Sequence, residues 1–298
     1  MASPLLHLAV LESLAREAGS LPETLARALA EDAEYGRFGV LLPDLPSFHN
    51  PVAGLRELAG ATSRPPPLFT RLLHGPRPMA LLFKAAELVA RGALVGRSAG
   101  QALLAGYLVH VALDRVLDGQ ARRLGEQLGR ERGGEASQTR RVEWLQALCY
   151  LRQQFGREPL GSRELVDWMR VTKRRGIPWA GVGGGIYEVT RLSLLEVYGQ
   201  APSKGDVDGW VRGVYLVSRL LASPLGTKLG GPAVLERHQS LVYRGPGVDF
   251  PTAVQRGTDE ARRYLVRLDQ FLGRGDFGPR ARGRFLSEIP EGDAATAA

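Results

Sequence analysis

The chain has 298 residues, of which 44% are hydrophobic and 23% charged, so it is long enough to bury a core and its composition excludes a disordered protein. One cysteine, Cys149, excludes an internal disulfide framework and indicates a reducing compartment. No apolar run reaches the roughly 18 residues of a membrane-spanning helix, and charged residues from Glu12 onward come too early for a signal peptide. We therefore expect a cytoplasmic protein.

The formal net charge of +8 favours anionic partners: nucleic acid, an anionic membrane surface or a phosphate-bearing substrate. The basic clusters are scattered, with few aromatic residues among them; they are Arg122-Arg123, Arg140-Arg141, Lys173-Arg174-Arg175 and the arginines of 280–284. This pattern disfavours nucleic-acid binding. A phosphodiester substrate and a peripheral contact with an anionic membrane both fit the charge.

Helical periodicity dominates the start of the chain. Leucines at three- and four-residue spacing predict an amphipathic helix over 5–15, and Ser20–Glu23 has the pattern of a capping box that opens a second helix reaching about Ala33. Gly, Pro, Asn and Ser then interrupt the pattern, which predicts a long loop over 35–76. A loop of that length in a compact domain is usually functional or disordered.

The rest of the chain is also predicted to be helical. Helical periodicity covers 79–94, the very apolar stretch 98–118, and 138–154, followed by 162–171, 186–198, 206–222, 232–241 and 252–273. Period-two alternation is almost absent, so the predicted fold class is all-α. A boundary at Gly156–Pro159 divides the chain into a helical domain over 1–155 and a mainly helical region over 156–290, packed on the first domain or on a partner. Residues 291–298 are expected to form a flexible tail.

His110 and Asp114 are the first candidates for a functional site. They lie four residues apart on the apolar helix 98–118, so both project from one face, and Asp118 continues the stripe one turn later. A carboxylate in so apolar a helix is costly to bury unless it is paired or bound to a metal. The spacing allows two side chains to bind one zinc ion. The alternative is a helix pair in which His110 donates to Asp114.

Three more residues could join them. Asp44 directly follows the apolar residues Leu41-Leu42-Pro43. Its alternative role is a helix cap or an Asx turn. His74 directly precedes Gly75. Its alternative role is a histidine at the C-terminal end of a helix, where a positive charge interacts favourably with the helix dipole. His7 lies near the apolar face of the first helix and could instead be a core histidine.

Together these residues resemble the bacterial zinc-dependent phospholipase C family (the phospholipase C/D domain). The resemblance covers residues 1–155 and rests on an early His7, on Pro43-Asp44, on His74, on Gly106-Tyr107-Leu108-Val109-His110-x3-Asp114, and on Glu143 in a later helix. It implies a multi-helix bundle of that type, extended here by C-terminal helices, and a hydrolase holding up to three zinc ions. Asp44, His74, His110 and Asp114 match one metal site, and His7 with a shared carboxylate matches a second. Asp44 would also be catalytic, bridging metals or orienting the attacking water.

The chain departs from the family pattern at the third metal site. Asp118 lies near the position where family members often carry a histidine, and Thr139 replaces the first residue of a His-x3-Glu pair, leaving Glu143. Secreted family members also use an N-terminal tryptophan and its amine, whereas this chain begins with Met1. Asp118 and Glu143 could still hold a harder ion such as Mg or Mn.

Two hypotheses follow. The chain is a zinc-dependent phosphodiester hydrolase acting on phospholipid-like substrates, or a catalytically degenerate scaffold or partner-binding protein that keeps one structural metal site. His49 and His238 match nothing in the family pattern and are interpreted as surface or structural residues. The sequence contains no Gly-x-Ser-x-Gly motif, which disfavours an α/β-hydrolase lipase.

Overall fold

The computed structural model of the chain describes residues 3–17, 19–52, 67–75, 77–92, 96–132, 135–156, 160–161, 163–171, 183–245 and 247–289. Regular structure in these ranges is almost entirely helical. The exception is a short antiparallel pair, β1 (Arg244–Gly245) with β2 (Val248–Asp249). The prediction of an all-α fold is confirmed. The tail predicted at 291–298 lies outside the described residues.

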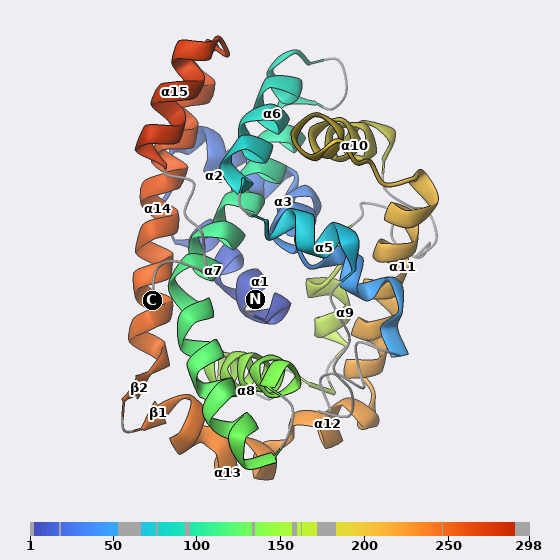
Figure 1. Cartoon of the computed structure of the whole chain (residues 1–298), viewed down its shortest axis with the longest axis vertical. Coiled ribbons are helices and arrows are strands. Elements are labelled where there is room, and N and C mark those ends of the chain that lie inside the picture. Colours follow the sequence, from blue (N-terminus) through green and yellow to red (C-terminus); the bar gives the residue numbers. More distant parts are fainter. Residues whose placement is uncertain are drawn as a thin grey trace.

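The first half of the chain builds the interior of the molecule (Figure 1). Its elements are α1 (Pro4–Arg16), α2 (Glu23–Glu31), α3 (Ala33–Leu41), the 3-10 helix η1 (Leu45–His49), α5 (Leu68–Leu73), α6 (Pro78–Ala90), α7 (Arg97–Arg132) and α8 (Glu135–Phe155). Helix α1 lies near the middle of the view and contacts α3, α7 and α8. Most of its residues are buried, including every leucine of the predicted stripe.

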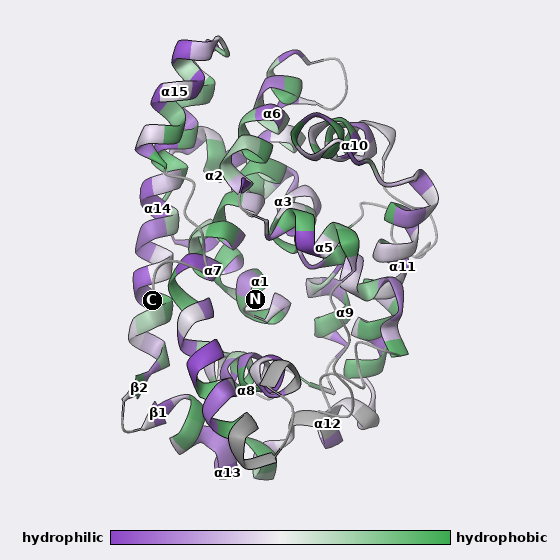
Figure 2. Ribbon diagram, in the orientation of Figure 1, coloured by the Kyte–Doolittle hydropathy of each residue, from purple (hydrophilic) through white to green (hydrophobic). Residues whose placement is uncertain are grey.

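The second half packs around this interior. It contains α9 (Glu164–Trp168), α10 (Gly184–Tyr198), α11 (Lys204–Leu221), α12 (Pro224–Gly230), α13 (Pro232–Val242), α14 (Phe250–Arg274) and α15 (Pro279–Glu288). Helix α14 runs along α7, α13 lies against α8, and α10 lies against α6. Figure 2 shows why: polar and apolar residues alternate along α14, whereas α6 is mostly hydrophobic. The amphipathic helix therefore forms an outer layer and the apolar one belongs to the core.

Two local predictions are wrong. The region 35–76 was predicted to be a loop, but it contains most of α3, together with η1 and α5. The predicted capping box at Ser20–Glu23 does not form either, because Pro22 is the N-cap of α2 and the Ser20 hydroxyl instead donates to the carbonyl of Leu14 at 2.8 Å.

Glycine explains the error at α3. Gly36 and Gly39 weaken helix propensity, which makes the segment resemble a loop. In the folded chain they face α7, which also presents a glycine, Gly106, to α3. A Cβ atom added at Gly39 would lie 2.0 Å from the carbonyl oxygen of Leu103, and one added at Gly106 would lie 2.0 Å from that of Gly36. The glycines therefore let two helix backbones touch, and this packing outweighs the low propensity.

No helix in the described part of the chain is both long enough and apolar enough to cross a membrane.

Gly106→Ala should destabilise the protein by about 1–3 kcal/mol, because the new methyl group meets rigid backbone atoms of α3 rather than a movable side chain. Urea unfolding of the metal-free protein would measure this loss. Gly119→Ala on the same helix is the matched control, since its Cβ would meet only a flexible arginine at 3.7 Å. The control should be neutral or stabilising by up to about 1 kcal/mol. Equal stability of the two variants would contradict the close-contact interpretation.

Candidate metal centre

Five polar side chains from four parts of the chain converge inside the molecule. His7 lies on α1, Asp44 is the N-cap residue of η1, His74 is the C-cap residue of α5, and His110 and Asp114 lie on α7. Their side chains are between 0% and 15% exposed. His74 is the most exposed of the five, so solvent reaches the cluster from the His74 side.

Backbone carbonyls fix the orientation of two of the imidazoles. His110 Nδ1 lies 2.8 Å from the Val40 carbonyl oxygen, and His74 Nδ1 lies 2.9 Å from that of Thr70. A carbonyl can only accept, so each Nδ1 carries hydrogen and each Nε2 is left for another ligand. The Val40 bond depends on the close contact of α3 with α7. Metal-binding histidines usually have this second-shell arrangement.

The two Nε2 atoms face each other together with carboxylate oxygens. They lie 3.2 Å apart; His74 Nε2 is 3.4 Å from both Asp44 Oδ1 and Asp114 Oδ2, and His110 Nε2 is 3.0 Å from Asp114 Oδ2. Bonds of about 2.0–2.2 Å at tetrahedral angles would separate neighbouring ligand atoms by about 3.3–3.6 Å. These four separations are close to the edges expected around a metal ion, although Asp44 and Asp114 fall into separate groups of ligand atoms.

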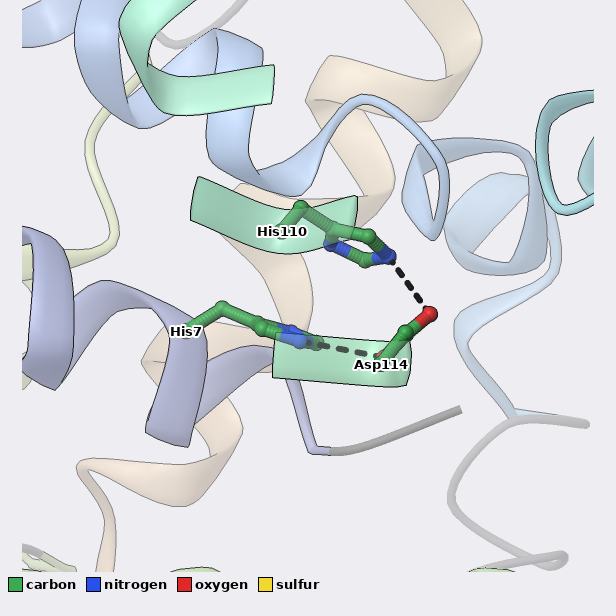
Figure 3. A group of neighbouring side chains, drawn as sticks. All are labelled: His7, His110 and Asp114. Carbon is green, nitrogen blue, oxygen red and sulfur yellow. Dashed lines mark ion pairs between the residues drawn. The ribbon is translucent and has the colours of Figure 1, made fainter. Parts of the chain in front are cut away.

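His7 lies beside His110 and faces the second oxygen of each of the same two carboxylates. Its Nε2 is 3.2 Å from Asp114 Oδ1 and its Nδ1 is 3.9 Å from Asp44 Oδ2, and its ring stacks on that of His110 at 4.0 Å. Figure 3 shows Asp114 between His7 and His110, one oxygen toward each. Neither ring nitrogen of His7 has a hydrogen-bond partner of good geometry among the described residues. Each carboxylate thus presents one oxygen to the His74–His110 side and one to His7.

Among the described residues, two groups have ligand atoms that all lie within 4.8 Å of one another: Asp44 with His74 and His110, and His7 with His110 and Asp114. These buried groups could hold a metal ion.

The charges of the cluster are strongly coupled. Burial opposes protonation of His110, but the adjacent Asp114 carboxylate outweighs it and the pKa of His110 rises to about 9. Burial by itself would raise the pKa of Asp114, and the neighbouring imidazoles instead hold it well below its ordinary value. The pKa of Asp44 is lowered in the same way, chiefly by its contact with His74 acting against burial. Burial and the charge of His110 lower the pKa of His7. Without a metal, a proton on His110 therefore takes the place of a cation.

Asp118 and Glu143 belong to neither of the two groups. Asp118 lies one turn beyond Asp114, and its pKa is raised by burial and by the Asp114 charge. Burial, with a further contribution from the Asp118 charge, raises the pKa of Glu143 on α8 to about 8. Glu143 is buried and Asp118 partly buried, and together they extend the acidic region from α7 toward α8. Thr139, one turn before Glu143, faces α7, because a Cβ atom at Gly125 would lie 2.2 Å from its hydroxyl oxygen.

The alternative roles considered for single residues are partly realised. Asp44 makes no side-chain capping bond to η1, so its carboxylate faces the cluster instead. His74 does end its helix, and it faces the cluster as well. His110 and Asp114 form the expected pair at four-residue spacing. His49 is exposed and His238 lies on α13, whereas Cys149 is buried in the core.

Two contributors to the site could not be found from the sequence. The carbonyls of Val40 and Thr70 orient His110 and His74, and a main-chain acceptor has no residue-type signature. The only trace is positional, since Thr70 precedes His74 by one helical turn.

Comparison of the chain with protein-family models, with curated proteins and with solved structures finds no match. The resemblance to zinc-dependent phospholipases C therefore rests on the motif residues alone.

Metal affinity should rise with pH, because a divalent ion at His110 Nε2 must displace the proton that its pKa of about 9 retains at neutral pH. The His110 proton is bound below that pKa and lost above it, so competition weakens as pH increases. We expect the apparent affinity to increase up to about tenfold per pH unit from pH 7 toward 9. Titration calorimetry in two buffers of different ionisation enthalpy would count the released proton. A His238→Gln variant should behave as wild type, and an affinity independent of pH would contradict this assignment.

Proposed function

We propose that this protein is a metal-dependent phosphodiester hydrolase that acts on phospholipid-like substrates and binds zinc. The observation that carries the proposal is the convergence of two imidazoles and two carboxylates: His74 Nε2 lies 3.4 Å from an oxygen of Asp44 and of Asp114, and His110 Nε2 lies 3.0 Å from Asp114, while the second oxygen of each carboxylate faces His7. Two nitrogen and two oxygen ligands suit zinc better than magnesium or calcium.

The donor atoms fit such an ion. Asp44 Oδ2 and both nitrogens of His7 are buried and make no hydrogen bond of good geometry among the described residues, although His7 Nε2 lies 3.2 Å from Asp114 Oδ1; a cation bound there would lower the cost of this burial. His7 has a lowered pKa and would bind in its neutral form. Asp44, His74, His110 and Asp114 would form one site. His7 Nε2 with Asp114 Oδ1 would form part of a second, and Asp44 Oδ2 lies near the other nitrogen of His7.

Zinc bound here would polarise a phosphoryl oxygen and lower the pKa of a coordinated water. The chain's own residues supply the rest. The Val40 and Thr70 carbonyls hold the imidazoles in one tautomer, and Asp44 Oδ2 can accept a proton from a water on the His7 side. The substrate would approach from the His74 side, where the side chain is 15% exposed. The net charge of +8 favours the approach of an anionic phosphodiester.

A second candidate function is a scaffold with one structural metal. Four protein ligands around one ion leave no open position, as in structural zinc sites, and Thr139 replaces a histidine of the family pattern. An ion at His7 would have fewer protein ligands and would keep positions for water or substrate. The number of ions per chain therefore separates the two functions. Asp118 and Glu143 could add a site for Mg or Mn.

His110→Ala should abolish zinc binding at the four-ligand site and lower phosphodiester hydrolysis by more than about 100-fold, because it removes a ligand and the imidazole closest to Asp114. Metal content by mass spectrometry and hydrolysis of phosphatidylcholine vesicles and of a chromogenic phosphodiester would be measured on the same samples.

His238→Ala is the control, since this histidine bonds only to its own helix in the described structure and lies outside both groups. Two zinc ions per wild-type chain with turnover support the hydrolase. One ion without turnover supports the scaffold, and absence of stoichiometric metal from the wild type rejects both.

A further inference from the structure

Helix α11 belongs to the second half of the chain, yet it packs against the segments that carry Asp44 and His74. Its main partner is η1, whose N-cap residue is Asp44. Figure 1 shows the blue segment after α3 running beside α11. The Trp210 ring of α11 also packs on Phe69 of α5, with centroids 5.5 Å apart, and α5 ends at His74.

The contact with η1 depends on glycine. A Cβ atom at Gly213 would lie 1.8 Å from the carbonyl oxygen of Phe48 and 2.6 Å from its carbonyl carbon. A Cβ atom at Gly209 would meet the His49 ring at 2.9 Å, which a side-chain rotation could relieve. Gly205, one turn earlier, faces only the Ser203 hydroxyl at 3.7 Å. The contact at Gly213 is between backbones, so a side chain there must displace η1.

From η1 a short chain of polar contacts leads to His74. The hydroxyls of Ser47 and Thr70 lie 3.1 Å apart, and the Thr70 carbonyl accepts from His74 Nδ1 at 2.9 Å. A displacement of η1 would therefore move Asp44 directly and loosen the support of His74. His110 and Asp114 lie on α7 and would stay in place.

We propose that α11 is a positioning element for metal binding: its contacts at Gly213 and Trp210 set Asp44 and His74 against the two ligands of α7. The affinity of the centre for zinc then depends on a helix that contributes no ligand to it. This inference rests on the proposed metal centre and not on hydrolysis.

The test compares Gly213→Ala with Gly205→Ala, which makes the same chemical change on the same helix. Zinc affinity would be measured against a chelator on folded protein, well below the unfolding temperature, and the cobalt(II) form would report coordination geometry by its visible absorption. Gly213→Ala should bind zinc about 10–100-fold more weakly and change the cobalt spectrum. Gly205→Ala should stay within about twofold of wild type, because its Cβ enters open space.

Ser47→Ala provides a milder variant if Gly213→Ala does not fold. It removes the hydroxyl contact with Thr70 and should weaken zinc binding by about tenfold. A folded Gly213→Ala or Ser47→Ala with wild-type affinity and an unchanged cobalt spectrum would overturn the inference and reduce α11 to ordinary packing. Absence of zinc binding by the wild type would overturn both this inference and the proposed function. Zinc binding that follows these expectations without hydrolysis supports the inference while the hydrolase fails.

Discussion

Two carboxylates, those of Asp44 and Asp114, lie with three imidazoles in a mostly apolar interior, and they require a compensating positive charge. In water such a pair would be solvated, but here each oxygen faces a histidine nitrogen. The raised pKa of His110 is the direct consequence, because a proton is the smallest cation that the cluster can acquire by itself. A divalent metal meets the same requirement more fully, since it neutralises both carboxylates and leaves the imidazoles as neutral ligands.

The packing of the helices positions these charged groups, and glycines at the contacts set how closely the helix backbones approach one another. The contact of α3 with α7 through Gly39 and Gly106 brings the Val40 carbonyl to His110, and the contact of η1 with α11 through Gly213 locates Asp44. Because the contacting atoms belong to backbones, the separations cannot adapt by changes of rotamer. The halves of the chain consequently act together, the first supplying ligands and the second holding two of the ligand-bearing segments.

The sequence predicted the helices and part of the cluster for identifiable reasons. Strong helical periodicity located α7, and the four-residue spacing of His110 and Asp114 required them to share a face. Spacing could not bring His7, Asp44 and His74 to the same point, since that depends on how four elements pack; only the family resemblance grouped them. The loop predicted over 35–76 was wrong because Gly36 and Gly39 weaken a helix in isolation, whereas in the fold they allow its closest contact. The roles of the Val40 and Thr70 carbonyls have no signature in residue types.

The number of bound ions sets the net charge of the centre, and this charge decides whether the centre attracts an anionic substrate. One divalent ion cancels the charges of Asp44 and Asp114, which gives a neutral, four-ligand site with little attraction for an anion. A second ion on the His7 side adds positive charge to the centre, and Glu143 offsets it only in part, because burial raises its pKa to about 8 and favours its neutral form. An anionic phosphodiester would then complete both the charge balance and the open coordination positions. Under the proposed functions, the same scaffold would serve a structural role with one ion and phosphodiester chemistry with two.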